Sequence, residues 1–153
     1  DKIIQAETSY IAKDYTAVVE GLKSEAPNSL PKGVQYTLAA SSLELDNLTQ
    51  EQKEAVSRNL SQKSSENTLS YWIYIGRGEL EKALDIAQNI GDIQYILHAY
   101  TKLYDQVNTD STMSGAKKRE LLEKYQKEID KLQEQLNGSS KANITSKETK
   151  NGN

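Results

Sequence analysis

The residue in this sequence best suited to metal binding or general-base catalysis is its only histidine, His98. Zinc sites use three or four protein ligands, drawn mainly from His, Cys, Asp and Glu. The sequence contains no cysteine and no second histidine to complete such a set around His98. We therefore expect a structural role for His98, and we predict no metal site and no cofactor. The lack of cysteine also excludes zinc ribbons, thiol redox sites and disulfide scaffolds.

Two other patterns resemble catalytic sites. They are better explained as a solvent-exposed helix face and as a tight turn between helices. Four carboxylates could suggest an acid–base pair: Glu79, Glu81, Asp85 and Asp92. Lys82 lies one turn away, which is typical of a solvated helix face. The stretch Gly76-Arg77-Gly78 is too short for a phosphate loop and has neither a preceding strand nor a following Lys-Ser/Thr. The sequence therefore predicts no catalytic residue, and we expect the protein not to be an enzyme.

Aromatic residues indicate a different chemistry, that of binding another protein. The chain has nine tyrosines and no phenylalanine, and one region is rich in aromatics: Tyr71, Trp72, Tyr74, Tyr95, Tyr100 and Tyr104. We expect Trp72 to pack in the core. Because arginine beside tyrosine is typical of interaction hot spots, we predict a partner-binding surface at Tyr71, Tyr74 and Arg77. Arg77 could equally neutralise the last carbonyls of its own helix.

The elements that position these residues are helices. Apolar residues recur at helical spacing in nearly every segment, and strand-like alternation is scarce. Ser29 is expected to cap the third helix, and Thr49 to Gln52 reads as a capping box that opens the fourth. A loop is expected at 61–65. The predicted helices cover residues 2–12, 14–24, 30–45, 50–60, 66–75, 79–89, 93–106 and 116–137.

This pattern predicts an all-α fold of stacked helical hairpins, tetratricopeptide-like in their packing, followed by a long C-terminal heptad helix. The apolar residues of that last helix are spaced by three and four: Leu122, Tyr125, Ile129, Leu132 and Leu136. We expect this seam to fold back onto the preceding helices, although pairing with a second copy is the alternative. The predicted core is Leu22, Leu38, Leu43, Val56, Leu60, Trp72, Leu80, Ala83, Leu84, Ile86, Leu97 and Leu103.

The expected organisation is one helical domain over residues 1–137 and a disordered polar tail over 138–153. The formal net charge of −3 and the pI near 5.3 give no indication of nucleic-acid binding. No apolar run is long enough to cross a bilayer. The chain begins at Asp1 and its single methionine is Met113, so we expect it to be a piece of a longer protein.

Several short motifs, in their order along the chain, resemble one known family. The most specific are Tyr71-Trp72-Ile73-x-Ile75-Gly76-Arg77 and Ala87-x-x-Ile90-Gly91-Asp92. The others are Asp14-Tyr15, Leu30-Pro31-Lys32, Tyr36-x-Leu38-Ala39, Leu48-Thr49-x-Glu51-Gln52-Lys53 and Ala99-Tyr100. Over residues 3–136 the chain resembles the extracytoplasmic C-terminal domain of the EssB/YukC family, membrane subunits of Gram-positive type VII secretion systems.

The resemblance implies a structural subunit that acts in assembly and partner binding, with virulence as one biological context. It implies a single-pass protein of the cell membrane, with this domain outside the membrane and the membrane segment absent from this chain. The implied partners are other membrane subunits of the secretion system, secreted protein substrates, and a second copy in a homodimer of the full-length protein. The residues alone leave an alternative open, a soluble helical-repeat adaptor that binds peptides or helices in the cytosol.

Overall fold

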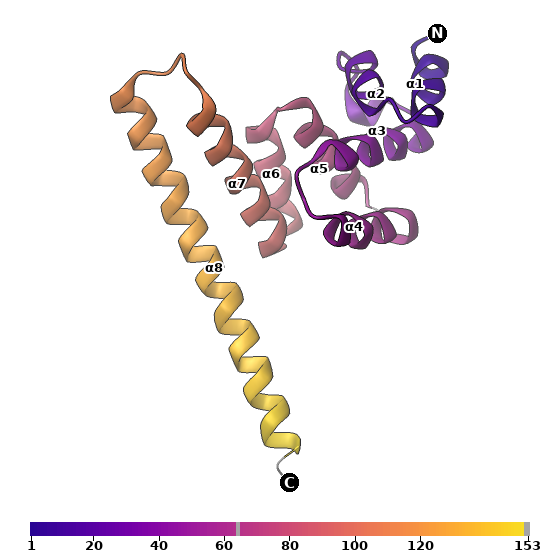
Figure 1. Cartoon of the computed structure of the whole chain (residues 1–153). Helices are drawn as coiled ribbons and strands as arrows, with labels where there is room; N and C mark the ends of the chain where they lie inside the picture. The colour runs from indigo at the N-terminus through magenta and orange to yellow at the C-terminus, as the bar shows by residue number, and fades with distance from the viewer. Residues whose placement is uncertain (64, 152–153) are drawn as a thin grey trace. The chain divides into compact units, whose positions relative to one another are not determined.

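The computed structural model describes residues 1–63 and 65–151, with side chains described up to Gly138 except for 62 and 63. The described residues form helices and no strand, so the all-α prediction is confirmed (Figure 1). They divide into two compact units, residues 1–90 and residues from 91 onward, which are described separately below. The helices are α1 (Lys2–Ile11), α2 (Tyr15–Gly21), η1 (Pro27–Ser29), α3 (Lys32–Leu45), α4 (Gln50–Lys63), α5 (Glu66–Arg77), α6 (Leu80–Ile90), α7 (Ile93–Thr109) and α8 (Gly115–Asn151).

Polar side chains begin most of these helices by accepting hydrogen bonds from first-turn amides. Asp14 accepts from the amide of Ala17 at 3.2 Å, and Ser65 accepts from that of Thr68 at 3.2 Å. The predicted capping box at the start of α4 is confirmed. Its threonine Oγ1 accepts from the amide of Gln52 at 3.2 Å, and the Gln52 side chain accepts from the amide of Thr49 at 3.0 Å.

The predicted cap of the third helix was wrong. Ser29 belongs to η1, and its hydroxyl donates to the Ala26 carbonyl at 2.7 Å instead of capping α3. The α-helix begins only after Pro31, which has extended backbone angles. The physical reason is the proline, because its ring disfavours the helical region for the preceding residue, and Leu30 has φ −91° and ψ 148°.

Two other boundaries differ from the prediction. Helix α4 continues to Lys63, so most of the loop expected at 61–65 is helical. Helix α5 continues through Gly76 to Arg77, and the next residue, Gly78, has a φ of 73° in the left-handed region that terminates helices. The second glycine, and not the first, is therefore the helix break.

Gly76 is needed where α5 crosses α3. A Cβ placed on Gly76 would lie 2.5 Å from the Cβ of Ser42 and 3.2 Å from its Cα. Such distances are shorter than van der Waals contact, so only a residue without a side chain fits. This close approach lies within the most extensive helix pairing of the first unit, that of α3 with α5.

The core of the first unit is centred on these two helices. Eight of the twelve predicted core residues of the chain are buried: Leu22, Leu38, Leu43, Leu60, Trp72, Leu80, Ala83 and Leu103. The other four are half-buried, namely Val56, Leu84, Ile86 and Leu97. The tetratricopeptide-like stacking of the hairpins and the single domain over 1–137 stay predictions.

The second unit is a helical hairpin in which α8 folds back against α7 (Figure 1). The heptad seam is covered within the chain, as predicted, because Tyr125, Ile129 and Leu132 are all at most 8% exposed. The rings of Tyr100 and Tyr125 lie 6.1 Å apart across the hairpin.

The end of α8 differs from the prediction. The helix continues through Gly138 to Asn151 instead of ending at 137. A helical glycine costs only about 1 kcal/mol relative to alanine, and no proline follows it. The disorder expected for 138–153 stays a prediction, and residues 152 and 153 lie outside the described residues.

Replacing Lys13 with glycine should raise the free energy of unfolding by about 1 kcal/mol, measured by urea denaturation. Lys13 has a φ of 61°, and among the described residues it is the one non-glycine with a positive φ. Glycine adopts this conformation without a Cβ penalty. The control is Gly91→Ala, which places a Cβ at a φ of 78° and should lower stability by a similar amount. An unchanged or lower midpoint for Lys13→Gly would contradict the prediction.

Candidate functional site

Tyr71 is not part of the predicted partner-binding surface, because its side chain is fully buried. It packs edge-to-face against Trp72, with ring centroids 5.4 Å apart, and Trp72 is 2% exposed. The core prediction for Trp72 is therefore confirmed, and the surface assignment of Tyr71 is wrong. Helix α5 packs against both α3 and α6, so it is buried on more than one side. An exposed face inferred from helical spacing alone is unreliable for such a helix.

Tyr74 remains half-buried near the end of α5 and has charged neighbours. The ammonium of Lys82 lies 5.6 Å from the centre of the Tyr74 ring, which is cation–π distance. The same ammonium donates to the Glu79 carboxylate at 2.9 Å, and this hydrogen bond is the largest cause that raises the pKa of Lys82. The turn between α5 and α6 thus carries a tyrosine, two cations and a carboxylate.

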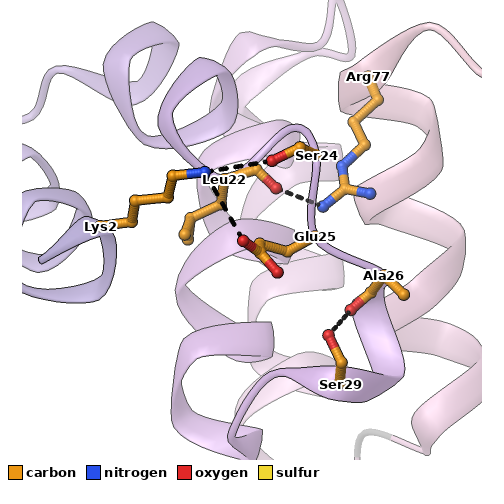
Figure 2. A network of polar contacts seen from close by, with 7 residues as sticks. All are labelled: Lys2, Leu22, Ser24, Glu25, Ala26, Ser29 and Arg77. Carbon is orange, nitrogen blue, oxygen red and sulfur yellow. Dashed lines mark hydrogen bonds and ion pairs between the residues drawn. The ribbon is translucent and has the colours of Figure 1, made fainter.

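Arg77 is half-buried and caps a helix, although not its own. Its Nη2 donates to the carbonyl of Leu22 at 2.9 Å, and Leu22 is the C-cap residue of α2 (Figure 2). The cation therefore lies at the negative end of another helix, on a carbonyl that also accepts from the amide of Glu25 at 3.1 Å. Burial lowers the pKa of Arg77, while Glu79, Tyr74 and Glu25 act in the opposite direction.

The loop that Arg77 binds is also held from α1. Figure 2 shows residues 22–26 with Lys2 on one side and Arg77 on the other. The Lys2 ammonium donates to the Ser24 hydroxyl at 3.3 Å and lies 3.7 Å from the Glu25 carboxylate. Both ion-pair side chains are largely exposed, so this pair contributes at most about 1 kcal/mol. The Arg77 contact is the better protected of the two.

Sequence reasoning missed this arrangement. Arg77 and Leu22 are 55 residues apart, and a backbone carbonyl leaves no signature in residue types. The structure also gives structural roles to residues considered as catalytic candidates. Glu79 pairs with Lys82, and Asp92 caps α7 through the amide of Gln94. His98 is half-buried on α7.

No cluster of potential ligands gathers on the described residues that could hold a metal ion. The region around Arg77 is therefore a candidate for binding and not for coordination chemistry. It presents an exposed ammonium, a half-buried guanidinium and a half-buried aromatic ring, which suit contacts with another protein.

Comparison with known proteins identifies the family. The family model described as "WXG100 protein secretion system (Wss), protein YukC" matches residues 1–135. The chain belongs to the YukC family. This match covers the first unit and residues 91–135 of the second, and it includes Tyr74, Arg77 and the Leu22 loop.

Named YukC and EssB proteins are among its relatives. The chain is 30% identical over 140 residues to the ESX secretion system protein YukC of Bacillus subtilis, covering 91% of this chain and 29% of that protein. It is 26% identical over 138 residues to the type VII secretion system protein EssB of Staphylococcus aureus, covering 89% and 30%. An uncharacterized protein of Clostridium acetobutylicum is 46% identical over 134 residues, covering 88% and 36%. The chain thus spans about a third of the length of the curated relatives it matches.

A solved structure has the same fold. The crystal structure of the EssB extracellular fragment of Geobacillus thermodenitrificans matches with a TM-score of 0.78 and 34% identity, covering 94% of this chain and 95% of that one. The resemblance to an EssB/YukC domain is therefore confirmed. Within the described residues, no helix is both long enough and apolar enough to cross a membrane.

Proposed function

We propose that this chain is the extracytoplasmic domain of a structural membrane subunit of a type VII secretion system, and that it acts in assembly by binding a partner protein. The observation that carries the proposal is the match to an EssB extracellular fragment over 94% of the chain. A non-enzymatic role agrees with this proposal, since the described polar side chains near Arg77 act as caps and ion pairs. Other membrane subunits of the system are the proposed partners.

The proposed binding surface consists of Tyr74, Arg77 and Lys82, and we call it the Arg77 surface. These residues lie at the end of α5 and the start of α6, where three polar groups are close to one another. Tyrosine and arginine are the residue types that most often dominate binding energy at protein interfaces. Tyr71 is excluded from this surface because it is fully buried.

Tyr74→Ala combined with Arg77→Glu, placed in the full-length gene product, should stop secretion. Loss of an interface hot spot costs about 2 kcal/mol or more, which is about thirtyfold in affinity. A structural subunit that no longer contacts its neighbour stalls assembly of the whole system. The measurement is the amount of exported substrate in the culture medium, normalised to the amount of the subunit in the membrane.

The control must separate binding from folding, because Arg77→Glu also breaks the bond to Leu22. Tyr74→Ala alone leaves that bond in place and should already reduce secretion. Arg58→Glu makes the same charge change at an exposed position of α4 and should have no effect. Normal secretion by a stably folded double variant would contradict the proposed role of the Arg77 surface.

A further inference from the structure

The charge balance around Arg77 is incomplete within this chain. Two carboxylates, Glu79 and Glu25, raise the pKa of Arg77 against the effect of its burial. Each is already paired with a lysine: Glu25 lies 3.7 Å from Lys2, and Glu79 lies 2.9 Å from Lys82. Among the described residues, neither forms an ion pair with Arg77. The guanidinium therefore has a neutral carbonyl as its hydrogen-bond partner.

A half-buried cation in this situation has capacity left for a ligand. A guanidinium carries five N–H donors, and the hydrogen bond to Leu22 uses one on Nη2. Nε is buried and has no hydrogen-bond partner in the described part of the chain. Desolvating a charge is costly unless it is paired, and the Leu22 carbonyl compensates only part of that cost. Because Nε is buried, an approaching protein can reach only the Nη groups, and a carboxylate is the ligand whose charge suits them best.

The neighbouring groups suit a protein ligand. The Tyr74 ring is half-buried beside the cations, and the Lys82 ammonium lies above it at 5.6 Å. Lys82 is paired with Glu79, so Arg77 is a cation of this turn without an ion-pair partner among the described residues. A negatively charged residue on an approaching protein would meet attraction here, and its apolar neighbours could pack on the tyrosine.

We infer that the Arg77 guanidinium binds an aspartate or glutamate carboxylate of a different protein, with the Tyr74 ring as the adjoining contact. This inference rests on the proposed function, because it names the chemistry of the partner at the same Arg77 surface. In the bound state the guanidinium keeps its bond to the Leu22 carbonyl and gains a charged acceptor from the partner. Arg77 then joins the C-terminal end of α2, the end of α5 and the partner at one point.

Zero-length cross-linking tests the contact directly. In the full-length protein with Arg77→Lys, a water-soluble carbodiimide activates nearby carboxyl groups, and the lysine amine displaces the activating group to form an amide with net loss of one water. We expect mass spectrometry of treated membranes to find Lys at position 77 joined to an Asp or Glu of another protein. The wild-type arginine should give no such adduct. The Lys82–Glu79 pair, at 2.9 Å, should give an adduct in both samples and is the internal positive control.

Three results would overturn the inference. They are adducts of position 77 with Glu25 or Glu79 of the same chain, adducts that join two copies of this chain, and no adduct at 77 while the Lys82–Glu79 link forms. Circular dichroism should show that Arg77→Lys melts within a few degrees of the wild type, because an ammonium can still donate to Leu22.

A second measurement does not depend on the folding of that variant. A photo-reactive phenylalanine analogue at position 74 should capture a partner peptide that contains an acidic residue. Arg77→Gln in the same protein should reduce the yield at least about tenfold, because a neutral amide cannot replace the charge pair. If Tyr74→Ala blocks secretion but Arg77→Gln leaves the capture yield unchanged, the carboxylate inference fails and the proposed function stands. If Tyr74→Ala leaves secretion normal, the proposed role of the Arg77 surface in assembly fails.

Discussion

Replacing Gly76 with valine should lower the free energy of unfolding by about 3 kcal/mol. A Cβ at this position would lie 2.5 Å from the Ser42 Cβ and 3.2 Å from its Cα, so the backbones of α3 and α5 would have to separate. This pairing is the centre of the first unit, and separating it loosens contacts with neighbouring core residues. The measurement is the urea midpoint and slope of the 153-residue chain, followed by circular dichroism.

Two further variants identify the mechanism. Ser42→Gly removes the clashing Cβ and Oγ, so Gly76→Val combined with Ser42→Gly should regain much of the lost stability. Gly33→Val is the matched control, because a Cβ there meets nothing within 4 Å. Its effect should stay within about 0.5 kcal/mol. If Gly33→Val and Gly76→Val cost the same, the close approach of α3 and α5 is not the reason for the glycine.

Replacing Ile129 and Leu132 with aspartate should open the hairpin of α7 and α8. Both side chains are at most 8% exposed in the seam, and each substitution places a charge in an apolar contact. A buried unpaired carboxylate and a lost aliphatic side chain together cost about 3 kcal/mol or more per site. Amide hydrogen exchange in 93–138 should accelerate, and the helical signal should fall.

The mass of the chain should stay the same in this experiment, because the seam is covered by α7 and not by a second copy. Light scattering measures it alongside the melting curve. The control is Gln133→Asp with Gln135→Asp, which adds the same charge at two exposed positions of α8. A dimer-to-monomer change with unaltered melting would refute the fold-back packing of α8.

Local signals in the sequence were sufficient wherever one residue acts on its own helix. The capping box depends on Thr49 and Gln52, which lie within one helical turn of each other. The heptad seam of α8 could also be predicted, because apolar residues spaced by three and four form a stripe that another helix must cover. These features could be predicted because the physics that creates them is local.

Predictions from local signals were wrong where an adjacent proline or the packing of a distant helix changed the outcome. The capping potential of Ser29 predicts a helix that begins at Leu30. Pro31 prevents this, and α3 begins at Lys32. Gly76 was expected to end a helix, yet it lies inside α5, where the absence of a side chain leaves room for Ser42 of α3. Tyr71 reads as a surface residue, yet α5 is buried on more than one side.

By itself, the sequence determined the all-α class, the family resemblance and most of the core, because helical period, capping residues and ordered phrases are properties of neighbouring positions. Only the tertiary structure decided what Arg77 does. Its bond to the Leu22 carbonyl and the pairing of Glu25 with Lys2 join segments that meet only after α1, α2 and α5 have packed. A backbone carbonyl carries no residue type, so no reading of the chain could have found this contact.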